Sequence, residues 1–228
     1  FGSVARAPVV ADPAEYPLET PVRTAPAQRF VAAAAGPRGI ALLAPGFFEY
    51  EWTPAGDLAV TLLRAVGELS RADLWTRPGH AAWAQPTPAA QCLGTQRVEL
   101  ALAPLTAADV ERGDVLPALW EDVFAPPHAT WLRDARTLEP APVDVTLEGA
   151  GLVYSCVKPA QSGGSLVLRC YNATDRQVGG AWRFGDAIKT AHRVRADERE
   201  SVPVILENRG RVVRFSAGAH ELVTILVS

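Results

Sequence analysis

Cysteines are scarce in this sequence of 228 residues, and the three present are Cys92, Cys156 and Cys170. Three scattered cysteines are too few for the disulfide framework that stabilises many small secreted domains. Cys156 and Cys170 flank a predicted hairpin turn, and in that register they fall on opposite faces of the ribbon because side chains alternate along strands. We therefore expect all three thiols to be reduced, which fits a cytoplasmic protein.

The sequence also lacks the features of membrane and nucleic-acid-binding proteins. No apolar run approaches the ~20 residues that a membrane helix needs. The first stretch, FGSVARAPVV, has no continuous apolar core of the kind that signal peptides contain. The net charge is −3, and lysine and arginine form no cluster longer than two adjacent residues, so a nucleic-acid surface has no electrostatic support. We expect neither a membrane nor a nucleic acid among the partners.

Spacings typical of catalytic or metal-binding motifs are missing as well. The four histidines are far apart in the sequence, and none has the nearby histidine or carboxylate of a metal motif. The glycine-rich QSGGS at 161–165 joins two predicted strands, so it indicates a hairpin turn and not a phosphate loop. No nucleophile elbow is present. We therefore assign no catalytic residue and no metal ligand to this chain.

The sequence does contain a series of short stretches typical of strands. They include QRFVAAA (28–34) and GIALLAPG (39–46). The most apolar one, DLAVTLLRAV (57–66), predicts a strand buried on both faces. In QRVELALAP (96–104), Val98, Leu100 and Leu102 alternate with polar or small residues, which predicts a half-buried strand.

One short helix and a linker are predicted in the middle of the chain. Thr106 can cap the segment AADVERGDVLPALWEDVF, whose apolar residues recur with a period of about 3.6. Pro117 suits a first turn, so the regular part should start after Gly113. The Pro-rich connection at 125–142 then predicts a boundary between two domains, residues 1–142 and residues 143–228.

From residue 143 onward, short strands recur about every ten residues with turn residues between them, which is typical of an antiparallel β-sandwich. The last of these strands include AIKTAHRV (187–194) and VPVIL (202–206). The sequon Asn172-Ala-Thr is interpreted as a turn in which Asn172 and Asp175 bond their own backbone. RVRADERE (193–200) is interpreted as a solvated loop.

Two carboxylates in FFEYEW, Glu49 and Glu51, form a candidate site. If this stretch is a strand, both point to one face and lie ~7 Å apart. That separation falls in the range of ~5–9.5 Å used by the carboxylate pairs of glycosidases. We favour the alternative, in which the glutamates form the solvent face of a strand whose aromatic residues point inward.

The long polar stretch TRPGHAAWAQPTPAAQ (76–91) is a second candidate, because loops of this length are usually functional or disordered. Trp75 and Trp83 could offer apolar faces on which sugar rings stack, and Arg77 could donate several hydrogen bonds. Alternatively, the tryptophans pack on the sheet and the arginine extends to solvent. The residues alone leave both interpretations open.

Four stretches, in this order along the chain, resemble segments of the α-mannosidases of glycoside hydrolase family 38. FGSVARAP is similar to P-F-G-x-x-E-R-P, and GIALLAPGFFEYEW with GDLAVTLLRAVGELSR is similar to G-x-A-L-L-N-x-G … L-x-L-T-L-L-R-S. TRPGHAAWAQPTPAAQCLGTQRVELALAP resembles an arginine-glycine loop that leads to Gln-Cys and a strand ending in Y-A-L-x-P. SLVLRCYNATDRQVGGAWRF is similar to L-V-L-R-L-Y-N-P-T-D.

The resemblance implies an all-β, mainly antiparallel fold. Residues 1–142 would end a large β-supersandwich, residues 143–228 would form a terminal immunoglobulin-like β-sandwich, and the short helix would lie between them. The family's catalytic barrel, with its catalytic aspartates and a divalent metal that is usually zinc, has no counterpart in this chain. The resemblance therefore implies no cofactor in this segment. It implies two partners, the catalytic barrel of the same or a parent polypeptide and an oligosaccharide substrate.

For the loop at 76–91, the resemblance implies a position beside the sugar-binding cleft of the barrel. Arg77 best matches the family's arginine, His80 is its neighbour, and Trp75 and Trp83 are the candidate stacking faces. The proline after Arg77 departs from the family pattern and leaves the path of the loop open.

Three functions are compatible with the sequence. The first is a non-catalytic β portion of an α-mannosidase that supports the barrel and lends loop residues to the sugar site. The second is a stand-alone carbohydrate-binding module, and the third is a purely structural β-sandwich. The sequence that precedes this chain in its gene would distinguish the first from the second.

Overall fold

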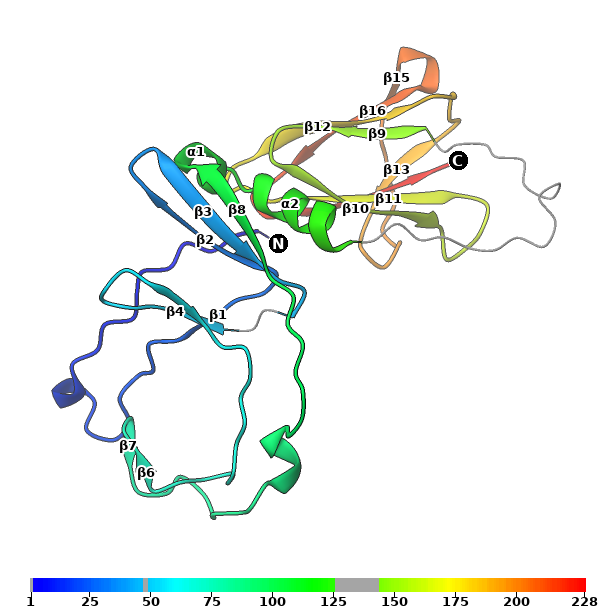
Figure 1. Cartoon of the computed structure of the whole chain (residues 1–228). Coiled ribbons are helices and arrows are strands. Elements are labelled where there is room, and N and C mark those ends of the chain that lie inside the picture. Colours follow the sequence, from blue (N-terminus) through cyan, green and yellow to red (C-terminus); the bar gives the residue numbers. More distant parts are fainter. Residues whose placement is uncertain (1, 47–48, 126–143) are drawn as a thin grey trace. The chain divides into compact units, whose positions relative to one another are not determined.

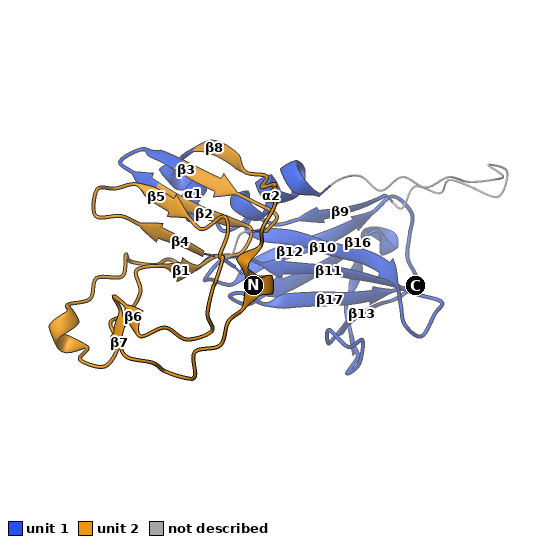
Figure 2. Cartoon of the chain, turned by 60° about the horizontal axis from the view of Figure 1, so that its bottom comes forward, with its two compact units in different colours: residues 1–4, 34–39, 105–228 blue, residues 5–33, 40–104 orange. Residues whose placement is uncertain are grey.

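The structure is a computed structural model that describes residues 2–46, 49–125 and 144–228. Its contacts divide the chain into two compact units (Figure 2). Unit 1 comprises residues 1–4, 34–39 and 105–228, and unit 2 comprises residues 5–33 and 40–104. The predicted domain boundary after residue 142 lies outside the described residues and stays a prediction. Among the described residues, no helix is both long and apolar enough to span a bilayer.

Unit 1 contains an antiparallel β-sandwich, as predicted (Figure 1). One sheet has the strand order β10-β11-β17-β13-β14, and the other has the order β15-β16-β12-β9. The strands are β9 (Val145–Glu148), β10 (Leu152–Pro159), β11 (Leu166–Asn172), β12 (Val178–Phe184), β13 (Ala191–Val194), β14 (Val202–Pro203), β15 (Leu206–Glu207), β16 (Val212–Ala217) and β17 (Leu222–Val227). A one-turn 3₁₀ helix, η4 (Asn208–Gly210), precedes β16.

Two of the strands differ from the prediction. The stretch 187–194 is a strand only in its second half, β13. The predicted strand at 202–206 is divided into β14 and β15, which belong to different sheets. The chain crosses from one sheet to the other just after Pro203, a residue that cannot donate to a ladder and therefore suits the edge of a sheet.

The core of the sandwich lies between its two sheets. Trp182 on β12 is the largest fully buried side chain, and the ring of Tyr154 on β10 meets it edge-on with 6.4 Å between ring centroids. A Cβ atom at Gly180 would lie 2.3 Å from Leu152 Cδ1 and 2.7 Å from Phe215 Cζ, so packing beside Trp182 requires glycine there. The other buried core residues are Leu168, Cys170, Ala191, Val213, Ala217, Val223, Ile225 and Val227.

The cysteines follow the sequence-based expectation. Cys92, Cys156 and Cys170 are all free thiols. Tyr154 pairs with Cys170 and, after an irregularity in the ladder, Cys156 pairs with Arg169, so the two strand cysteines occupy opposite faces. Burial raises the pKa of the Cys170 thiol to about 12, which keeps it protonated and unreactive.

The side chain of Asn172 joins the turn after β11 to the end of β16. Its Nδ2 donates to the carbonyl oxygens of Arg176 at 2.6 Å and Gly218 at 2.7 Å. Its Oδ1 accepts from the backbone N–H of Thr174 at 2.9 Å. The turn predicted from the sequon is confirmed for Asn172. It is wrong for Asp175, whose side chain makes no hydrogen bond within the described part of the chain.

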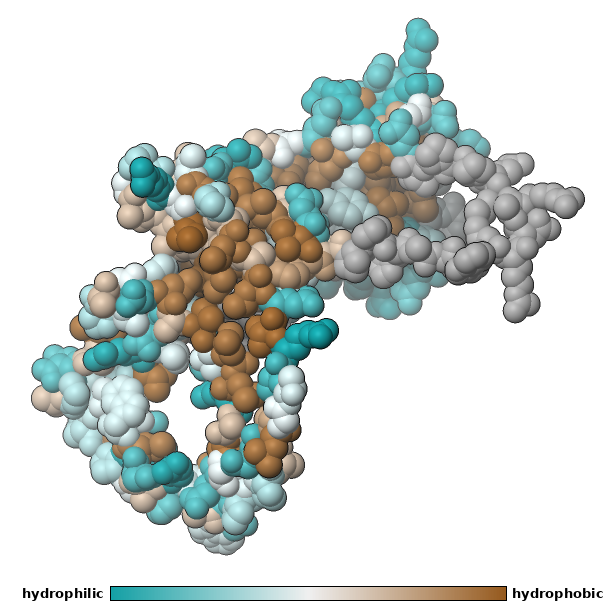
Figure 3. All heavy atoms as spheres, viewed as in Figure 1, coloured by the Kyte–Doolittle hydropathy of each residue, from teal (hydrophilic) through white to brown (hydrophobic). Residues whose placement is uncertain are grey.

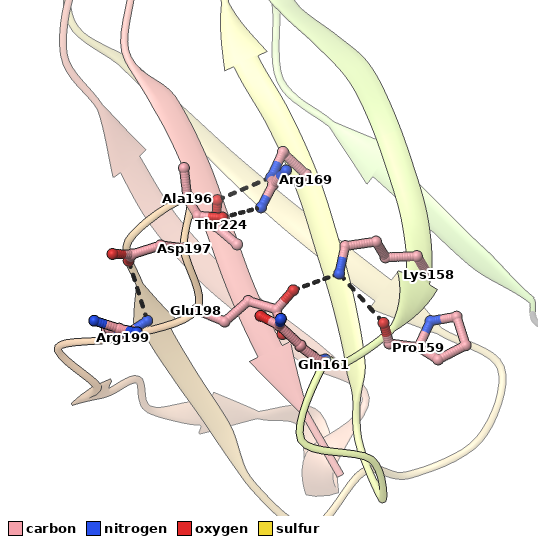
Figure 4. A network of polar contacts seen from close by, with 9 residues as sticks. All are labelled: Lys158, Pro159, Gln161, Arg169, Ala196, Asp197, Glu198, Arg199 and Thr224. Atoms are coloured by element: carbon pink, nitrogen blue, oxygen red, sulfur yellow. Dashed lines mark hydrogen bonds and ion pairs between the residues drawn. The ribbon is translucent and has the colours of Figure 1, made fainter.

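The turn that follows β13, predicted as a solvated loop, is fixed to the neighbouring strands by polar contacts (Figure 4). Glu198 accepts hydrogen bonds from Lys158 Nζ and from the backbone N–H of Gln161, the latter at 2.7 Å. Arg169 on β11 donates to the carbonyl oxygen of Ala196 at 2.7 Å. Most of the turn is solvent-exposed, as predicted, although Arg193 and Val194 belong to β13 and the contacts with Lys158, Gln161 and Arg169 fix the turn to the sheet.

Two helices stand where one was predicted, α1 (Ala107–Glu111) and α2 (Val115–Phe124). Thr106 caps α1 with a capping box, and Pro117 lies in the first turn of α2, as predicted. The first helix ends at Arg112, whose backbone is extended, and Gly113 next to it passes so close to Ala173 that a Cβ atom there would lie 2.3 Å from the Ala173 carbonyl oxygen.

Unit 2 is built from short strands and irregular segments (Figure 1). It contains a sheet of order β1-β4-β5 and a hairpin of β6 and β7, and a third sheet, β2-β3-β8, has residues in both units. The elements are η1 (Pro13–Glu15), β1 (Ala25–Pro26), β2 (Phe30–Ala35), β3 (Arg38–Leu43), β4 (Glu49–Trp52), β5 (Leu58–Val60), β6 (Asp73–Leu74), β7 (Arg77–Pro78), η2 (Pro88–Gln91) and β8 (Ala101–Thr106).

Two apolar stretches of unit 2 depart from the prediction. In 57–66 only β5 is a strand, and the expectation of burial on both faces is wrong, since Leu62 is 52% exposed. In 96–104 the strand starts at Ala101, and Val98, Leu100 and Leu102 are exposed instead of half-buried. Among the described residues, 62–65 and 97–100 belong to no sheet, and the first stretch is held only at its ends, by hydrogen bonds from Thr61 N–H to the carbonyl oxygen of Glu49 at 3.3 Å and from Val66 N–H to that of Ala90 at 3.1 Å.

Asn172→Ala should destabilise the sandwich by about 2–4 kcal/mol. The carbonyl oxygens of Arg176 and Gly218 would lose the hydrogen bonds that they accept from Asn172 Nδ2. The measurement is the free energy of unfolding in urea. The control is Gln177→Ala, an exposed residue of the same turn, for which a change below about 0.5 kcal/mol is expected. Equal effects of the two substitutions would contradict the role of Asn172.

Glu198 should make stability depend on pH. The hydrogen bonds from Lys158 and from the backbone of Gln161 lower the pKa of the Glu198 carboxyl. A carboxyl with a lowered folded-state pKa stabilises the fold above its unfolded-state pKa, and this contribution is lost as pH falls through the folded-state value. Wild type should therefore lose more stability than Glu198→Gln between about pH 6 and pH 3.

Urea unfolding of both proteins across that pH range is the measurement. Gln161→Ala is the control, because it keeps the backbone N–H that Glu198 uses and removes only an exposed side chain. Parallel pH profiles for wild type and Glu198→Gln would show that the carboxyl does not contribute.

Candidate functional site

The loop predicted at 76–91 begins inside a hairpin. Strands β6 and β7 pair through Leu74 and Arg77, so Trp75 and Thr76 form the turn. The carbonyl oxygen of Thr76 accepts a hydrogen bond from the backbone N–H of Thr20 at 2.7 Å, and Thr76 is buried. Because Thr76 is held inward, its neighbour Trp75 stands at the outer side of the turn and is 71% exposed.

Arg77 is mostly buried, with 19% of its side chain exposed. Its Nη1 lies 3.6 Å from Glu19 Oε2, and the Glu19 side chain is 57% exposed, so the pair is not an internal one. The buried Nε of Arg77 has no hydrogen-bond partner among the residues that the structure describes. A buried donor without a partner is unfavourable by about 1–3 kcal/mol. Arg77 therefore retains an unused hydrogen-bonding capacity on the hairpin.

His80 and Trp83 lie further along the same loop. His80 is exposed, and its Nδ1 lies 3.4 Å from the hydroxyl oxygen of Ser70, which is buried. The same hydroxyl accepts a hydrogen bond from the backbone N–H of Ala82 at 3.3 Å. Trp83 is 85% exposed, so neither tryptophan of the loop is packed on a sheet.

A hollow of about 890 Å³ is lined by Trp75 together with the two candidate carboxylates, Glu49 and Glu51. Strand β4 points Glu49 and Glu51 to the same side, as predicted, while Tyr50 between them is buried. Trp75 borders the hollow, whereas Arg77, His80 and Trp83 do not. The lining residues are Val22, Arg23, Thr24, Ala25, Pro26, Glu49, Glu51, Arg64 and Trp75.

The charged groups of this hollow are weakly paired. Arg64 Nε lies 3.7 Å from Glu49 Oε1, which is beyond hydrogen-bond distance, and the Glu49 side chain is 17% exposed. Glu51 and Arg23 have no hydrogen bond or ion pair among the described residues. The positive charges of Arg23 and Arg64 offset the negative charges of Glu49 and Glu51. The hollow therefore presents acceptors, donors and one aromatic face without a net charge.

Sequence reasoning identified part of this arrangement. It placed the two glutamates on one face and gave Trp75 a possible stacking role, but it did not connect them and did not single out Arg23 or Arg64. Arg64 carries the one positive charge within the apolar stretch 57–66, and that exception was the available signal. No group of three or more His, Cys, Asp and Glu side chains is placed to hold a metal ion in the part of the chain that the structure describes.

Comparison with protein families gives a match in the sandwich. Residues 151–225 match the model of the glycosyl hydrolases family 38 C-terminal beta sandwich domain. A protein of Halalkalibacterium halodurans named putative mannosylglycerate hydrolase is 32% identical to this chain over 148 residues. The match covers 64% of this chain and 15% of that protein.

Two solved structures share the fold over nearly the whole chain. A protein in the glycosyl hydrolase family 38 from Enterococcus faecalis is 21% identical, with a TM-score of 0.63, and the match covers 90% of this chain and 22% of that one. An alpha-mannosidase from Enterococcus faecalis V583 is 22% identical, with a TM-score of 0.63, and the match covers 91% and 22%. The chain thus spans about a fifth of the solved chains that it matches.

Proposed function

Because this chain has the C-terminal β region of glycoside hydrolase family 38, we propose that it is the non-catalytic β portion of an α-mannosidase-like enzyme. In this role it supports the catalytic barrel of the same or a parent polypeptide and lends loop residues to the sugar site. The parent reaction is the hydrolysis of α-mannosidic bonds in an oligosaccharide. We place the divalent metal of that reaction in the barrel and the enzyme in the cytoplasm.

The proposed supporting role rests on one observation. Unit 2 has an apolar surface on which the backbone N–H and C=O groups of two segments are unpaired among the described residues. Residues 62–65 and 97–100 run in extended segments and make no backbone hydrogen bond among the described residues. Leu62, Leu63, Val98 and Leu100 on these segments are all exposed. The two segments line a second hollow of about 360 Å³. Figure 3 shows apolar residues gathered on a face of the molecule.

Such a surface is a candidate for pairing with further strands. Exposed apolar stretches with unpaired N–H and C=O groups are templates for further strands, and soluble proteins usually cover them. The matched proteins are several times longer than this chain. Additional β-structure of the parent polypeptide would pair with both segments, complete the layer over them, and connect the chain to the barrel.

The contribution to the sugar site rests on the hairpin of β6 and β7. Arg77 carries an unpartnered buried Nε, and His80 and Trp75 on the same loop are exposed. A guanidinium group suits hydroxyl or carboxylate oxygens, because it offers several donors in one plane. Arg77 is the position that matches the family's arginine, so we assign it the contact to the sugar.

The purified 228-residue chain should show no glycosidase activity, because it lacks the family's catalytic aspartates and the barrel that carries them. The measurement is release of the aryl group from an aryl α-mannoside with and without added zinc. Zinc-dependent release above the uncatalysed rate would contradict the proposal. The intact parent enzyme is the positive control.

In the intact enzyme, Arg77→Ala should lower kcat/KM by about 10- to 150-fold, which corresponds to the loss of a charged hydrogen bond worth ~1.5–3 kcal/mol. Since the Arg77 side chain is mostly buried, we also expect a stability loss of about 1 kcal/mol. The activity is therefore compared at equal folded fraction, measured by thermal unfolding.

Arg71→Ala is the matched control for Arg77→Ala. Arg71 lies just before the same hairpin, is 56% exposed and pairs with Asp73. It should leave kcat/KM unchanged. If Arg77→Ala lost stability and kept full activity, Arg77 would be a scaffold residue and the contribution of this loop to the sugar site would be refuted.

A further inference from the structure

We propose that the hollow lined by Glu49, Glu51, Arg64 and Trp75 binds a neutral pyranose sugar. The site belongs wholly to unit 2, and it comes from strands β1 and β4, the hairpin of β6 and β7, and the extended segment after β5. The choice of mannose as the sugar to test rests on the proposed function.

The carboxylates supply the acceptors. Glu49 and Glu51 stand on one face of β4, and neither makes a hydrogen bond within the described part of the chain. Ionised carboxylates that lack donors are strong acceptors, and a carboxylate can accept from two neighbouring hydroxyl groups at once. A pyranose presents adjacent hydroxyls in this way. The unused acceptors of the hollow therefore match the donors of a sugar ring.

Arg64 and Trp75 supply the other two contacts. Arg64 is 67% exposed and lies 3.7 Å from Glu49, so its remaining N–H groups can donate to sugar oxygens. Trp75 stands at the tip of its hairpin with its ring largely free. A flat apolar ring that borders a polar hollow offers a surface for the C–H face of a pyranose, while the hydroxyls reach the charged groups.

Other ligand classes fit less well. An anion gains no net attraction, because the charges of Glu49 and Glu51 offset those of Arg23 and Arg64, and a divalent cation would find only two carboxylates beside two arginines. A purely apolar ligand would leave four charged groups buried and unpaired. The volume of about 890 Å³ lies within the range of roughly 300–1,000 Å³ typical of small-molecule sites. A neutral sugar of one or two rings satisfies both volume and chemistry.

The test is a titration of the purified 228-residue chain with methyl α-mannoside, followed by calorimetry and by tryptophan fluorescence. We expect saturable binding. Trp75→Ala should weaken the affinity by about 2- to 10-fold, and Glu51→Gln by about 10-fold. Circular dichroism of each variant verifies that the fold is retained.

Trp83→Ala is the matched control, since Trp83 is a more exposed tryptophan of the same loop that does not line the hollow. It should bind like wild type. An equal loss in Trp83→Ala and Trp75→Ala would overturn the inference, as would the absence of saturable binding by a folded wild-type chain. Tighter binding of glucuronate than of methyl α-mannoside would also overturn it, because the site would then select for a negative charge.

This test is independent of the kinetic one. If the chain fails to bind methyl α-mannoside while Arg77→Ala still impairs the intact enzyme, only the assignment of the hollow falls. If the chain binds the sugar and Arg77→Ala leaves the activity of the enzyme unchanged, the sugar-binding assignment of the hollow is supported and the contribution of Arg77 is refuted.

Discussion

Burial between two facing layers is the constraint on which this structure depends. Where two sheets face each other, as around Trp182, short strands suffice, because each places its inward residues against the other sheet. Where the second layer is missing from the described residues, strongly apolar sequence does not produce a strand. The stretch around Leu62 is more apolar than most strands of the sandwich, yet it has no ladder partner and remains in solvent.

The same constraint explains where the polar chemistry lies. In the sandwich several charged groups are paired, and the contacts of Glu198 and Arg169 fix a turn to the sheet. In unit 2 several polar groups are unpaired, including Nε of Arg77 and the carboxylate of Glu51. Unpaired groups in partly buried positions are unfavourable for folding unless something else bonds to them.

The sequence predicted the sandwich well because the features that specify its strands and turns involve residues close together in the chain. Alternation in strands such as β12, the turn at Asn172 and the cap at Thr106 depend on residues close together in the chain. The prediction failed where the outcome depends on distant partners. The hollow unites Glu51 with Trp75 and Arg64, which no spacing along the chain could indicate.

The burial of Asn172 has a consequence for producing the protein. The Asn-Ala-Thr triplet is a formal acceptor for N-linked glycans, and glycosylation modifies the Nδ2 atom that here donates to three carbonyl oxygens. A glycan could therefore be attached only before β11 and β16 come together, and it would then keep them apart. Passage through a compartment with the oligosaccharide-transferring machinery would divide the nascent chains into folded, unmodified molecules and modified molecules that cannot close the sandwich.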